Sequence, residues 1–421
     1  MLVGIPILHY RHSSGLGTFV WKVFKAQVNK ERKFSVRSIV FIQNGDFREA
    51  FKRFADGGAE TYRDQKKSVD FVAALAPKAR VTTVAFGPKA YRTELAPNLW
   101  AVGLRRDGLR SSGIARVFDD TAPSHIVLRT PHLGFLRETQ KRKIWLLPVF
   151  ADIFVRKGVR TALQNFTVRR ALQRSRSPCV SNHSLNASRS LVSALGVPSE
   201  KVVPWDWSRV PLAGACKAGV ADPASPTAFF AGAMTEAKGV GDCLEAIAEL
   251  RKGGVNFSMA FAGPGDLRHW EKVAETLGIW DQVRFLGMIS NADVRREMHR
   301  HDFVIVPSRH SYAEGLPNTI YEGLASRSVL IISDHPAFVG RLKPGEECLM
   351  YPAANPKALA QCLKQATEDR ELYKRVSENS ERAHDGLYIG LEWSALVETF
   401  LDDPENRSGW VERNSLKSSM S

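Results

Sequence analysis

Short apolar runs alternate with longer amphipathic stretches along most of this chain. Over the first 206 residues the runs are VGIPILHY (3–10), SVRSIVFIQ (35–43), VTTVAFG (81–87), HIVLRT (125–130), IWLLPVFA (144–151) and PCVSN (178–182). After residue 226 the rhythm restarts with TAFFAGAM (227–234), FSMAFAGPG (257–265), VRFLGMI (283–289), DFVIVPS (302–308) and SVLIISD (328–334). Strands that alternate with helical segments are typical of βαβ units and a parallel sheet. The pattern predicts an α/β fold of two Rossmann-like, doubly wound parallel-sheet domains in tandem, with a cleft between them.

The domain boundaries follow from where this rhythm stops. Residues 207–226 lose periodicity and are rich in Pro, Gly, Ala and Ser, which predicts a linker between an N-terminal domain of residues 1–206 and a C-terminal domain of residues 227–386. An amphipathic stretch over 387–402 should form a helix that packs back on one of the domains. Residues 403–421 are polar enough to be disordered.

Sheets of this kind bind ligands at the carboxyl ends of their strands, so the strand-to-helix turns are where a site is expected. One such turn, AEGLPNTIYEGLAS (313–326), follows an apolar run and places Pro317 at or just before the start of a helix. Backbone N–H groups around 317–320 would point into the crevice and could bind an anion such as a nucleotide phosphate. Three residues at helical spacing should form the core face: Leu316, Ile320 and Leu324.

Two glutamates lie in this turn. Glu322 forms a capping-box pattern with Thr319, in which the glutamate would accept from a free backbone N–H; alternatively its carboxylate holds sugar hydroxyls, as acidic residues hold ribose in dinucleotide sites. Glu314 has no equally good structural explanation. It lies on a loop with glycine and proline near a helix N-terminus, so it is either solvated or directed at a ligand.

Other turns carry weaker signals. In FFAGAMTEAKG (229–239), Lys238 could reach a diphosphate as a point charge, or it could be an ordinary solvated lysine. The two glycines of FAGPGD (261–266) permit close backbone approach. Gly15 and Gly17 lie between a predicted strand and helix but do not complete G-x-G-x-x-G, and no P-loop motif occurs. Neither a Rossmann dehydrogenase nor a P-loop enzyme is supported.

The net charge of +15 is unevenly distributed. Residues 1–210 carry 36 Lys+Arg against 15 Asp+Glu, which leaves 23 against 29 in the rest. The basic residues concentrate over 137–176, which holds eleven Lys+Arg against only Glu138 and Asp152. Aromatic residues are interleaved with this stretch or lie beside it, among them Phe135, Trp145, Phe154 and Phe166. The stretch is either a solubilising face or a contact for an anionic membrane surface.

The cysteine pattern and the hydropathy of the chain limit its expected cellular location and the kinds of metal or membrane-spanning segment it could contain. The five cysteines are scattered without C-x-x-C spacing, which predicts a reducing cytoplasm and neither a zinc nor a redox site. No apolar run approaches the ~20 residues that a membrane span needs, and the N-terminus lacks a signal-peptide pattern. No D-x-D occurs, which argues against a metal-bridged diphosphate.

The motifs together resemble a known family. FVIVPSRHSYAEGLPNTIYEGLASRSVLIISDHPAF (303–338) resembles the E-x7-E region of the family 4 retaining glycosyltransferases, with Glu314 and Glu322 as its glutamates. FAGAMTEAKG resembles the family's G-R-L-x-x-x-K-G turn, and FAGPGD and VRFLGMI follow in the expected order. The resemblance is specific over about 227–382; before residue 205 it is only architectural.

This resemblance implies the GT-B arrangement, with the donor sugar nucleotide held mainly by the C-terminal domain and the acceptor by the N-terminal one. Glu314 would contact the donor sugar hydroxyls, Glu322 the ribose and Lys238 the diphosphate, so that Glu314 and Lys238 are the implied catalytic residues. Further donor contacts would come from Gly232, Gly263, Gly287, Gly315, Leu316, Pro317, Asn318 and Thr319. The N-domain candidates are Gly15, Gly17, His132 and Asp152.

The chain departs from the family pattern at two positions. Ala233 stands where the family's turn has an arginine, which removes half of the usual cationic clamp. The N-domain turn that often ends in histidine is VFADIF here, with Asp152 in its place. His132, at the preceding strand end, is a rival candidate, or simply a satisfied surface histidine.

The resulting expectation is a hexosyltransferase that retains anomeric configuration and needs no metal or other cofactor. It would move a sugar from a nucleotide-sugar donor to a glycan or polyprenyl-diphosphate-linked acceptor in cell-surface polysaccharide synthesis. We expect a cytoplasmic location, peripheral on the inner face of the membrane through residues 137–176, and no nucleic-acid partner. Two alternatives stay open: a nucleotide-sugar epimerase on the same fold, and a non-catalytic basic protein that binds membranes or nucleic acid.

Overall fold

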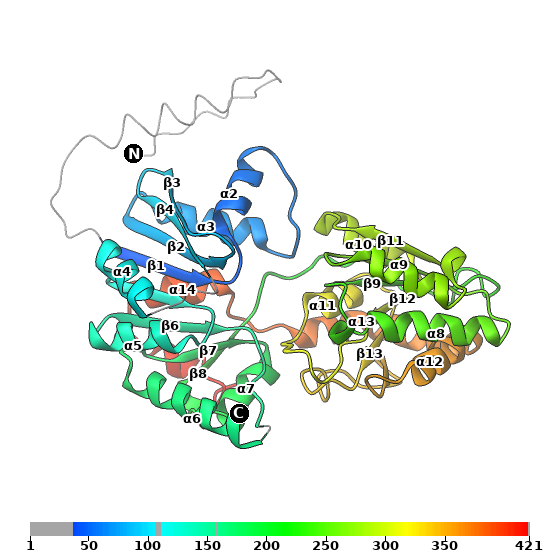
Figure 1. The fold of residues 1–421 in the computed structure, drawn as a ribbon. Helices are drawn as coiled ribbons and strands as arrows, with labels where there is room; N and C mark the ends of the chain where they lie inside the picture. Colours follow the sequence, from blue (N-terminus) through cyan, green and yellow to red (C-terminus); the bar gives the residue numbers. More distant parts are fainter. Residues whose placement is uncertain (1–36, 106–110, 157, 420–421) are drawn as a thin grey trace, which may run out of the picture. The chain divides into compact units, whose positions relative to one another are not determined.

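The computed structural model describes residues 37–105, 111–156 and 158–419, and two sheets organise them (Figure 1). The predicted strand at 3–10, Gly15 and Gly17 lie outside the described residues. We call β1 to β8 with α2 to α7 the N-terminal lobe, and β9 to β14 with α8 to α13 the C-terminal lobe. The predicted pair of doubly wound parallel-sheet domains is confirmed.

Within the described residues, the sheet of the N-terminal lobe has eight strands in the order β3-β4-β2-β1-β5-β6-β7-β8, all paired in parallel except β3 with β4. The strands are β1 (Arg37–Gln43), β2 (Ala79–Gly87), β3 (Tyr91–Ala96), β4 (Leu99–Arg105), β5 (His125–Leu128), β6 (Trp145–Phe150), β7 (Val180–His183) and β8 (Val202–Trp205). The helices are α2 (Phe47–Ala55), α3 (Gln65–Ala74), α4 (Ser111–Thr121), α5 (Leu133–Lys141), α6 (Gly158–Arg174) and α7 (Leu185–Ser193), and a 3-10 turn, η2 (Ser199–Lys201), precedes β8.

The sheet of the C-terminal lobe has the order β11-β10-β9-β12-β13-β14, and every pairing among these described strands is parallel. The strands are β9 (Thr227–Ala231), β10 (Ser258–Ala262), β11 (Val283–Gly287), β12 (Phe303–Val306), β13 (Val329–Ser333) and β14 (Leu349–Tyr351). The helices are α8 (Val240–Lys252), α9 (Leu267–Thr276), α10 (Asn291–Arg300), α11 (Asn318–Ala325), α12 (Pro356–Glu368) and α13 (Arg370–Leu387), with 3-10 turns η3 (Glu236–Lys238) and η4 (Trp280–Gln282).

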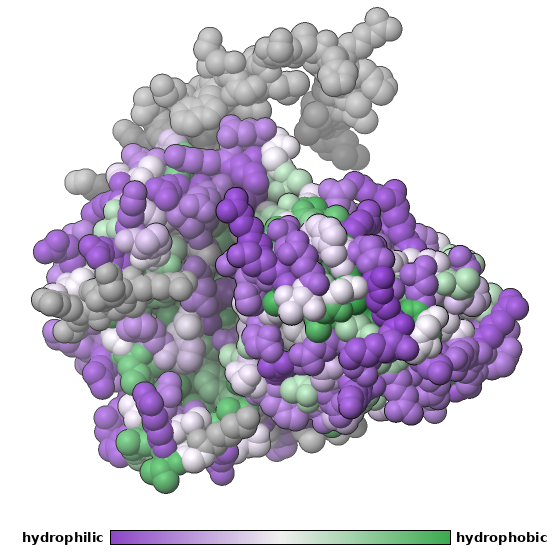
Figure 2. Space-filling model, turned by 45° about the vertical axis from the view of Figure 1, so that its right-hand side comes forward, coloured by the Kyte–Doolittle hydropathy of each residue, from purple (hydrophilic) through white to green (hydrophobic). Residues whose placement is uncertain are grey.

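The strands are apolar on both faces because each sheet is covered on both sides. In β1, Ile39 and Phe41 belong to one core cluster and Val40 and Ile42 to another. Most apolar side chains therefore lie inside the molecule. Hydrophilic residues cover most of the face shown in Figure 2, and hydrophobic ones form small patches on it. None of the described helices is long and apolar enough to cross a membrane.

Two segments connect the lobes. β8 ends at Trp205 and β9 begins at Thr227, and no helix or strand lies between them. The chain returns after α13, and α14 (Trp393–Asp402) packs in the core of the N-terminal lobe through Trp393, Leu396, Val397, Phe400 and Leu401. The two connections pair where they meet, because Asp206 N–H donates to the Leu391 carbonyl over 3.0 Å and Trp393 N–H to the Asp206 carbonyl over 2.9 Å.

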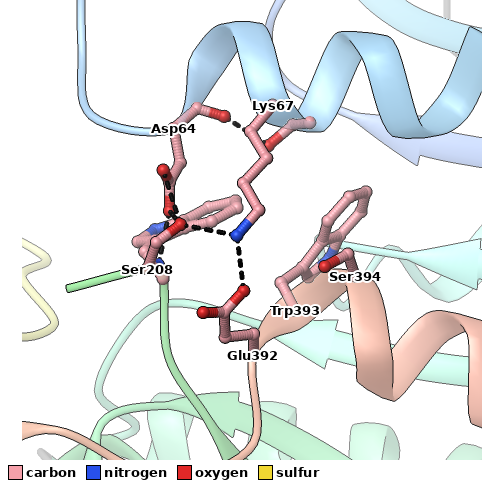
Figure 3. A pocket seen from close by; sticks show the side chains of 8 residues that line it. Asp64, Lys67, Ser208, Glu392, Trp393 and Ser394 are labelled. Carbon is pink, nitrogen blue, oxygen red and sulfur yellow. Dashed lines mark hydrogen bonds and ion pairs between the residues drawn. The ribbon is translucent and has the colours of Figure 1, made fainter.

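A polar cluster at the start of α3 fastens both connections (Figure 3). Lys67 Nζ donates to Ser208 Oγ over 2.8 Å on the first connection and to Glu392 Oε2 over 2.6 Å on the second. Asp64 accepts from the Ser208 hydroxyl over 2.9 Å. One end of α3 therefore holds the two segments side by side.

The C-terminal tail differs from its prediction as a disordered segment. Residues 403–419 continue from α14 into a short helix, α15 (Trp410–Arg413). Trp410 and Val411 join the core cluster that contains α14, and Leu416 N–H donates to the Val202 carbonyl over 2.7 Å. The abundant polar residues of this tail conceal a few apolar anchors, and these fix it on the N-terminal lobe.

Candidate functional site

A cavity of about 190 Å³ opens where strands of the C-terminal sheet end. The turns that follow β9, β10 and β11 line it, together with the first residues of α10 and α11 and a loop of the N-terminal lobe. Its lining residues are Thr61, Tyr62, Arg63, Ala231, Gly232, Ala233, Ala262, Gly263, Pro264, Met288, Ile289, Asn291, Val294, Asn318, Thr319 and Glu322. This is the edge of a doubly wound sheet at which ligands are expected to bind.

The wall of the cavity needs glycine where its turns touch. Gly263 has φ +144°, and a Cβ there would lie 1.8 Å from the Gly232 carbonyl oxygen. Gly263 N–H donates to the carbonyl of Gly287 over 2.8 Å, so Gly287 supports the wall from the end of β11. Of the four glycines predicted to bind the donor, Gly232 and Gly263 line the cavity, Gly287 lies behind them, and Gly315 is not among the lining residues.

The start of α11 forms one side of the cavity. Pro317 has an extended conformation with ψ 147° and is the N-cap, without a side-chain capping bond. The N–H groups of Asn318 and Thr319 therefore stand at the open, positive end of the helix, a suitable place for a phosphate oxygen. The predicted core face is confirmed, because Leu316, Ile320 and Leu324 are buried. Leu316 thus contributes packing at this site, and its side chain does not line the cavity.

Glu314 and Lys238 meet beside this helix start. Lys238 Nζ forms an ion pair with Glu314 Oε2, and Ser308 Oγ donates to the same oxygen over 2.9 Å. Both side chains are largely buried, at 13% exposure for Lys238 and 10% for Glu314. The ring of Tyr312 lies 4.5 Å from Lys238 Nζ. The alternative of a freely solvated lysine at position 238 is therefore wrong.

The turn that presents Lys238 is fixed from two sides. Thr235 caps η3, and Gly239 follows it with φ +78°, where a Cβ would lie 2.3 Å from the Pro307 carbonyl oxygen. Arg309 Nε and Nη2 each donate to the buried carboxylate of Asp242, over 2.9 and 2.6 Å, and Nη2 also reaches Glu236 at 2.5 Å. This bidentate clamp holds the turns after β9 and β12 together.

The N-terminal lobe touches the Glu314 turn through the end of β6. A Cβ on Gly315 would lie 2.1 Å from the Ala151 carbonyl oxygen, and Ile153 N–H donates to the Glu314 carbonyl over 3.4 Å. Asp152 follows Ala151 directly. Burial raises the pKa of Asp152, the charge of Glu314 raises it further, and Arg129 opposes the change. The structure therefore brings Asp152 to the site; of the four N-domain candidates, only Asp152 and His132 lie within the described residues.

His132, the other candidate, has a structural role. It is the N-cap of α5, and its Nδ1 accepts from Gly134 N–H over 3.2 Å. Its ring stacks on Phe86 with centroids 5.9 Å apart, and burial lowers its pKa. The described contacts of His132 are thus those of a capping histidine within the N-terminal lobe.

Glu322 lies in the cavity and does not cap α11. Thr319 Oγ1 donates to the Ala231 carbonyl over 3.2 Å, so the capping-box interpretation of Thr319 and Glu322 is wrong. Glu322 is only 4% exposed, and Asn291 Nδ2 donates to its Oε1 over 2.6 Å. Burial raises the pKa of Glu322 to about 7, although Asn291 and Arg63 favour its charged form.

The raised pKa of Glu322 predicts how pH changes stability. Between its unfolded value near 4.5 and about 7, the folded chain holds a proton that the unfolded chain has lost, so stability falls as pH rises through this window. Glu322→Gln keeps the acceptor for Asn291 but cannot ionise. From pH 5 to pH 8, we expect the wild type to lose about 2 kcal/mol of unfolding free energy relative to this variant, measured by urea denaturation. Parallel curves for the two proteins would contradict the raised pKa; Glu245→Gln, at an exposed position, is the control.

The sequence patterns did not predict one part of the site, a loop of the N-terminal lobe. The loop at 57–63 brings Thr61, Tyr62 and Arg63 into the cavity, and the Glu60 carbonyl accepts from Asn291 N–H over 2.8 Å. The signal available in the sequence was the adjacent pair Gly57-Gly58 between α2 and α3. Gly57 has φ +76°, which permits the sharp turn at the end of α2.

The comparisons with known proteins bear on this site. Residues 217–383 match the family model described as Glycosyl transferases group 1. These residues are similar to a domain of that family, and they contain the turns that carry Lys238, Glu314 and Glu322. The match covers the C-terminal lobe and the end of the linker.

Two curated relatives are similar to part of this chain. An alpha-D-kanosaminyltransferase of Streptomyces kanamyceticus is 27% identical over 156 residues, 37% of this chain and 40% of that protein. The amylovoran biosynthesis glycosyltransferase AmsK of Erwinia amylovora is 27% identical over 134 residues, 31% of this chain and 33% of that protein. The aligned part of the chain spans less than half the length of either relative.

Solved structures share the whole fold. A sucrose-phosphate synthase from Thermosynechococcus elongatus has a TM-score of 0.62 at 14% identity, over 87% of this chain and 98% of that one. HepE from Anabaena, solved with UDP and glucose, has a TM-score of 0.60 at 13% identity, over 88% and 99%. The predicted GT-B fold is confirmed by these likenesses.

Proposed function

We propose that this chain is a retaining glycosyltransferase that uses a nucleotide-sugar donor. The observation that carries the proposal is the buried pair of Glu314 and Lys238 beside the open N-terminus of α11, next to a cavity that contains Glu322. An enzyme that transfers a sugar must hold a diphosphate and grip sugar hydroxyls at adjacent points. The group 1 domain at 217–383 supplies groups of both kinds.

Each part of a donor has a matching group. The ribose would hydrogen-bond to Glu322 in the cavity, and the phosphates would accept from the N–H groups of Asn318 and Thr319. Lys238 would face the diphosphate as it departs. Glu314 would hold hydroxyls of the sugar, with Asp152 of the N-terminal lobe close by.

The reaction that fits these groups is displacement with retention. The bond between the anomeric carbon and the donor phosphate oxygen breaks, and the acceptor hydroxyl oxygen bonds to the same face of that carbon. The hydroxyl proton passes to the departing phosphate oxygen. Fixed positive charge and helix dipoles at the leaving group lower the barrier, because negative charge develops there. In this proposal Lys238 and the start of α11 supply that charge and dipole.

The direct test measures nucleoside diphosphate release. The full chain is incubated with UDP-, GDP- and TDP-sugars, with and without membrane lipid extract. We expect release from one donor class, stimulated by lipid. An epimerase would instead yield an isomerised sugar nucleotide without any acceptor, and a non-catalytic protein would release nothing and bind nucleic acid with strong salt dependence.

For the acceptor we propose a polyprenyl-diphosphate-linked glycan at an anionic membrane, in cell-surface polysaccharide synthesis on the cytoplasmic side. Helix α6 supports this placement. Its inner face is buried, and three large apolar residues stand exposed on the outer face at i, i+4 and i+7: Val159 at 87%, Leu163 at 65% and Phe166 at 53%. Four arginines and no acidic residue lie on the same helix: Arg160, Arg169, Arg170 and Arg174.

Most of the aromatic residues that were expected to contact a membrane beside the basic stretch at 137–176 are not exposed. Phe135 is fully buried, and Trp145 lies under the Arg176 guanidinium, 3.6 Å from its ring centroid. Phe154 packs partly against the core, which leaves Phe166 exposed. The membrane contact is therefore assigned to the outer face of α6 and not to the whole of 137–176.

This surface predicts a selective loss of lipid binding. Leu163→Ser combined with Phe166→Ser should weaken binding to phosphatidylglycerol vesicles by about tenfold or more, because both apolar groups would no longer insert. Co-sedimentation at low salt measures the effect. Trp280→Ser is the matched control, since Trp280 is 49% exposed on the C-terminal lobe. Unchanged binding of the double variant, or equal binding of the wild type to phosphatidylcholine vesicles, would refute the assignment.

A further inference from the structure

The cavity presents an imbalance of charge. Of the residues that line it from the C-terminal lobe, Glu322 is the single charged one in the described part of the chain, and it is an acid. Ala233 lines the cavity at the position where the resembling family has an arginine. Apart from Lys238, which lies outside this lining, the C-terminal lobe therefore offers no cation to a nucleoside diphosphate in the cavity, and a second cation would have to come from elsewhere.

Two nearby cations are already engaged. Arg309 Nε and Nη2 donate to the carboxylate of Asp242, and Nη2 also pairs with Glu236. Lys238 pairs with Glu314 outside the set of residues that line the cavity. Neither side chain can replace the arginine missing at position 233 without giving up a buried partner.

Arg63 is the cation that lines the cavity from the N-terminal lobe. It is 4% exposed, and its Nη2 donates to Asp206 Oδ1 over 3.1 Å. Its Nε and Nη1 are buried and have no hydrogen-bond acceptor among the described residues. Buried guanidinium donors without acceptors are costly, and such groups call for an explanation.

The surroundings of Arg63 orient its guanidinium without satisfying these donors. The group lies 4.4 Å from the ring centroid of Tyr321 and 5.4 Å from that of Tyr388. Asp206 does not depend on Arg63 alone, because it also accepts from His183 Nε2 over 3.1 Å and from Tyr321 over 2.9 Å. Stacking on a ring leaves the in-plane N–H groups of an arginine able to donate to a phosphate.

We propose that Arg63 binds a phosphate of the donor diphosphate and thereby replaces the arginine missing at position 233. The inference rests on the proposed function, because it assigns a residue to that donor. Nε and Nη1 are donors without an acceptor among the described residues, so either can donate to a phosphate oxygen, and the loop at 57–63 brings them in from the opposite lobe. Diphosphate binding then requires both lobes.

The test compares each nucleoside diphosphate with its own nucleoside. UDP, GDP and TDP, and uridine, guanosine and thymidine, are titrated calorimetrically into the full chain and its variants. Arg63→Gln should weaken binding of the recognised diphosphate about tenfold or more, with less than a twofold change for the nucleoside. Adding Ala233→Arg to this variant should restore diphosphate affinity to within about threefold of the wild type, since the charge returns from the other wall.

Three outcomes would overturn the assignment. Arg63→Gln could leave diphosphate affinity unchanged, it could weaken nucleoside and diphosphate equally, or Ala233→Arg could recover nothing. If Arg63→Gln does not fold, Arg63→Lys serves instead: it should bind the diphosphate more weakly than the wild type and the nucleoside equally, and an equal loss for both would refute the role. A wild-type chain that binds none of the diphosphates would refute the proposed donor itself, which separates the two failures.

Discussion

Glu314→Gln should reduce sugar transfer at least about 100-fold in kcat/KM while leaving nucleoside diphosphate binding intact or tighter. The glutamine keeps the size of the side chain and can still accept from Ser308, but it loses the charge that pairs with Lys238 and that, in the proposed mechanism, holds the sugar hydroxyls. Loss of one preorganised polar contact in a desolvated site costs about 3 kcal/mol in the transition state. The freed Lys238 can bind a diphosphate more strongly. Initial rates and product titration measure the two effects separately.

Two further variants sharpen this experiment. Ser308→Ala removes a hydrogen bond to Glu314 over 2.9 Å but leaves the ion pair, so that a loss of only a fewfold in kcat/KM is expected. Glu245→Gln, at an exposed position on α8, should match the wild type. Transfer by Glu314→Gln at the wild-type rate would remove Glu314 from the mechanism.

The sequence was informative about the C-terminal lobe because periodicity and turn chemistry agree there. β12 is a continuous apolar run, and the glycine and proline after it can belong only to a turn that exits a strand. Leu316 and Ile320 at helical spacing fixed the face of α11. The positions of Glu314 and Glu322 at one sheet edge followed from these elements.

The rest of the site depends on contacts between residues far apart in the sequence, which local sequence patterns do not reveal. The Lys238 ion pair requires the turns after β9 and β12 to touch, which Gly239 and the Arg309 clamp achieve. The capping-box pattern at Thr319 and Glu322 was misleading, because a long-range acceptor, the Ala231 carbonyl, competed for the threonine hydroxyl. A single sequence shows which residues can form hydrogen bonds but not which of several possible partners each one binds in the folded chain.

The prediction of a disordered tail at 403–421 and that of exposed aromatic residues along 137–176 were wrong for a related reason. Composition averages over a segment, whereas packing depends on a few side chains. Trp410 and Leu416 are enough to anchor a polar tail, and Phe135, counted as an interleaved aromatic, is a core residue. The exposed stripe on α6 could have been read from the spacing of Val159, Leu163 and Phe166, but its opposite face is apolar too, so the pattern alone did not identify the side in contact with solvent.

Asp206→Ala should destabilise the chain by about 3–5 kcal/mol at pH 7. Asp206 is completely buried on the first connection between the lobes, and its carboxylate accepts from Arg63, His183 and Tyr321 as well as from Trp207 N–H over 2.7 Å. Burial alone would raise the pKa of Asp206, but the hydrogen bond and charge of His183 and the charge of Arg63 lower it. Its stabilising effect is therefore present above the unfolded pKa near 3.8 and is lost as pH falls through the lower folded value.

The urea midpoint at pH 7 measures this loss. Asp206→Asn keeps the shape and should fall between the wild type and Asp206→Ala, because its amide oxygen keeps an acceptor for one of the two donors, Trp207 N–H or Tyr321, while Arg63 loses its counter-charge. Asp385→Ala is the matched control: Asp385 pairs with Arg209 over 2.5 Å at the surface, where an ion pair contributes about 1 kcal/mol at most. Tyr321 precedes Glu322 on α11, and Arg63 lines the cavity, so Asp206→Ala should also weaken diphosphate binding. An unchanged midpoint would show that the connection between the lobes does not depend on this carboxylate.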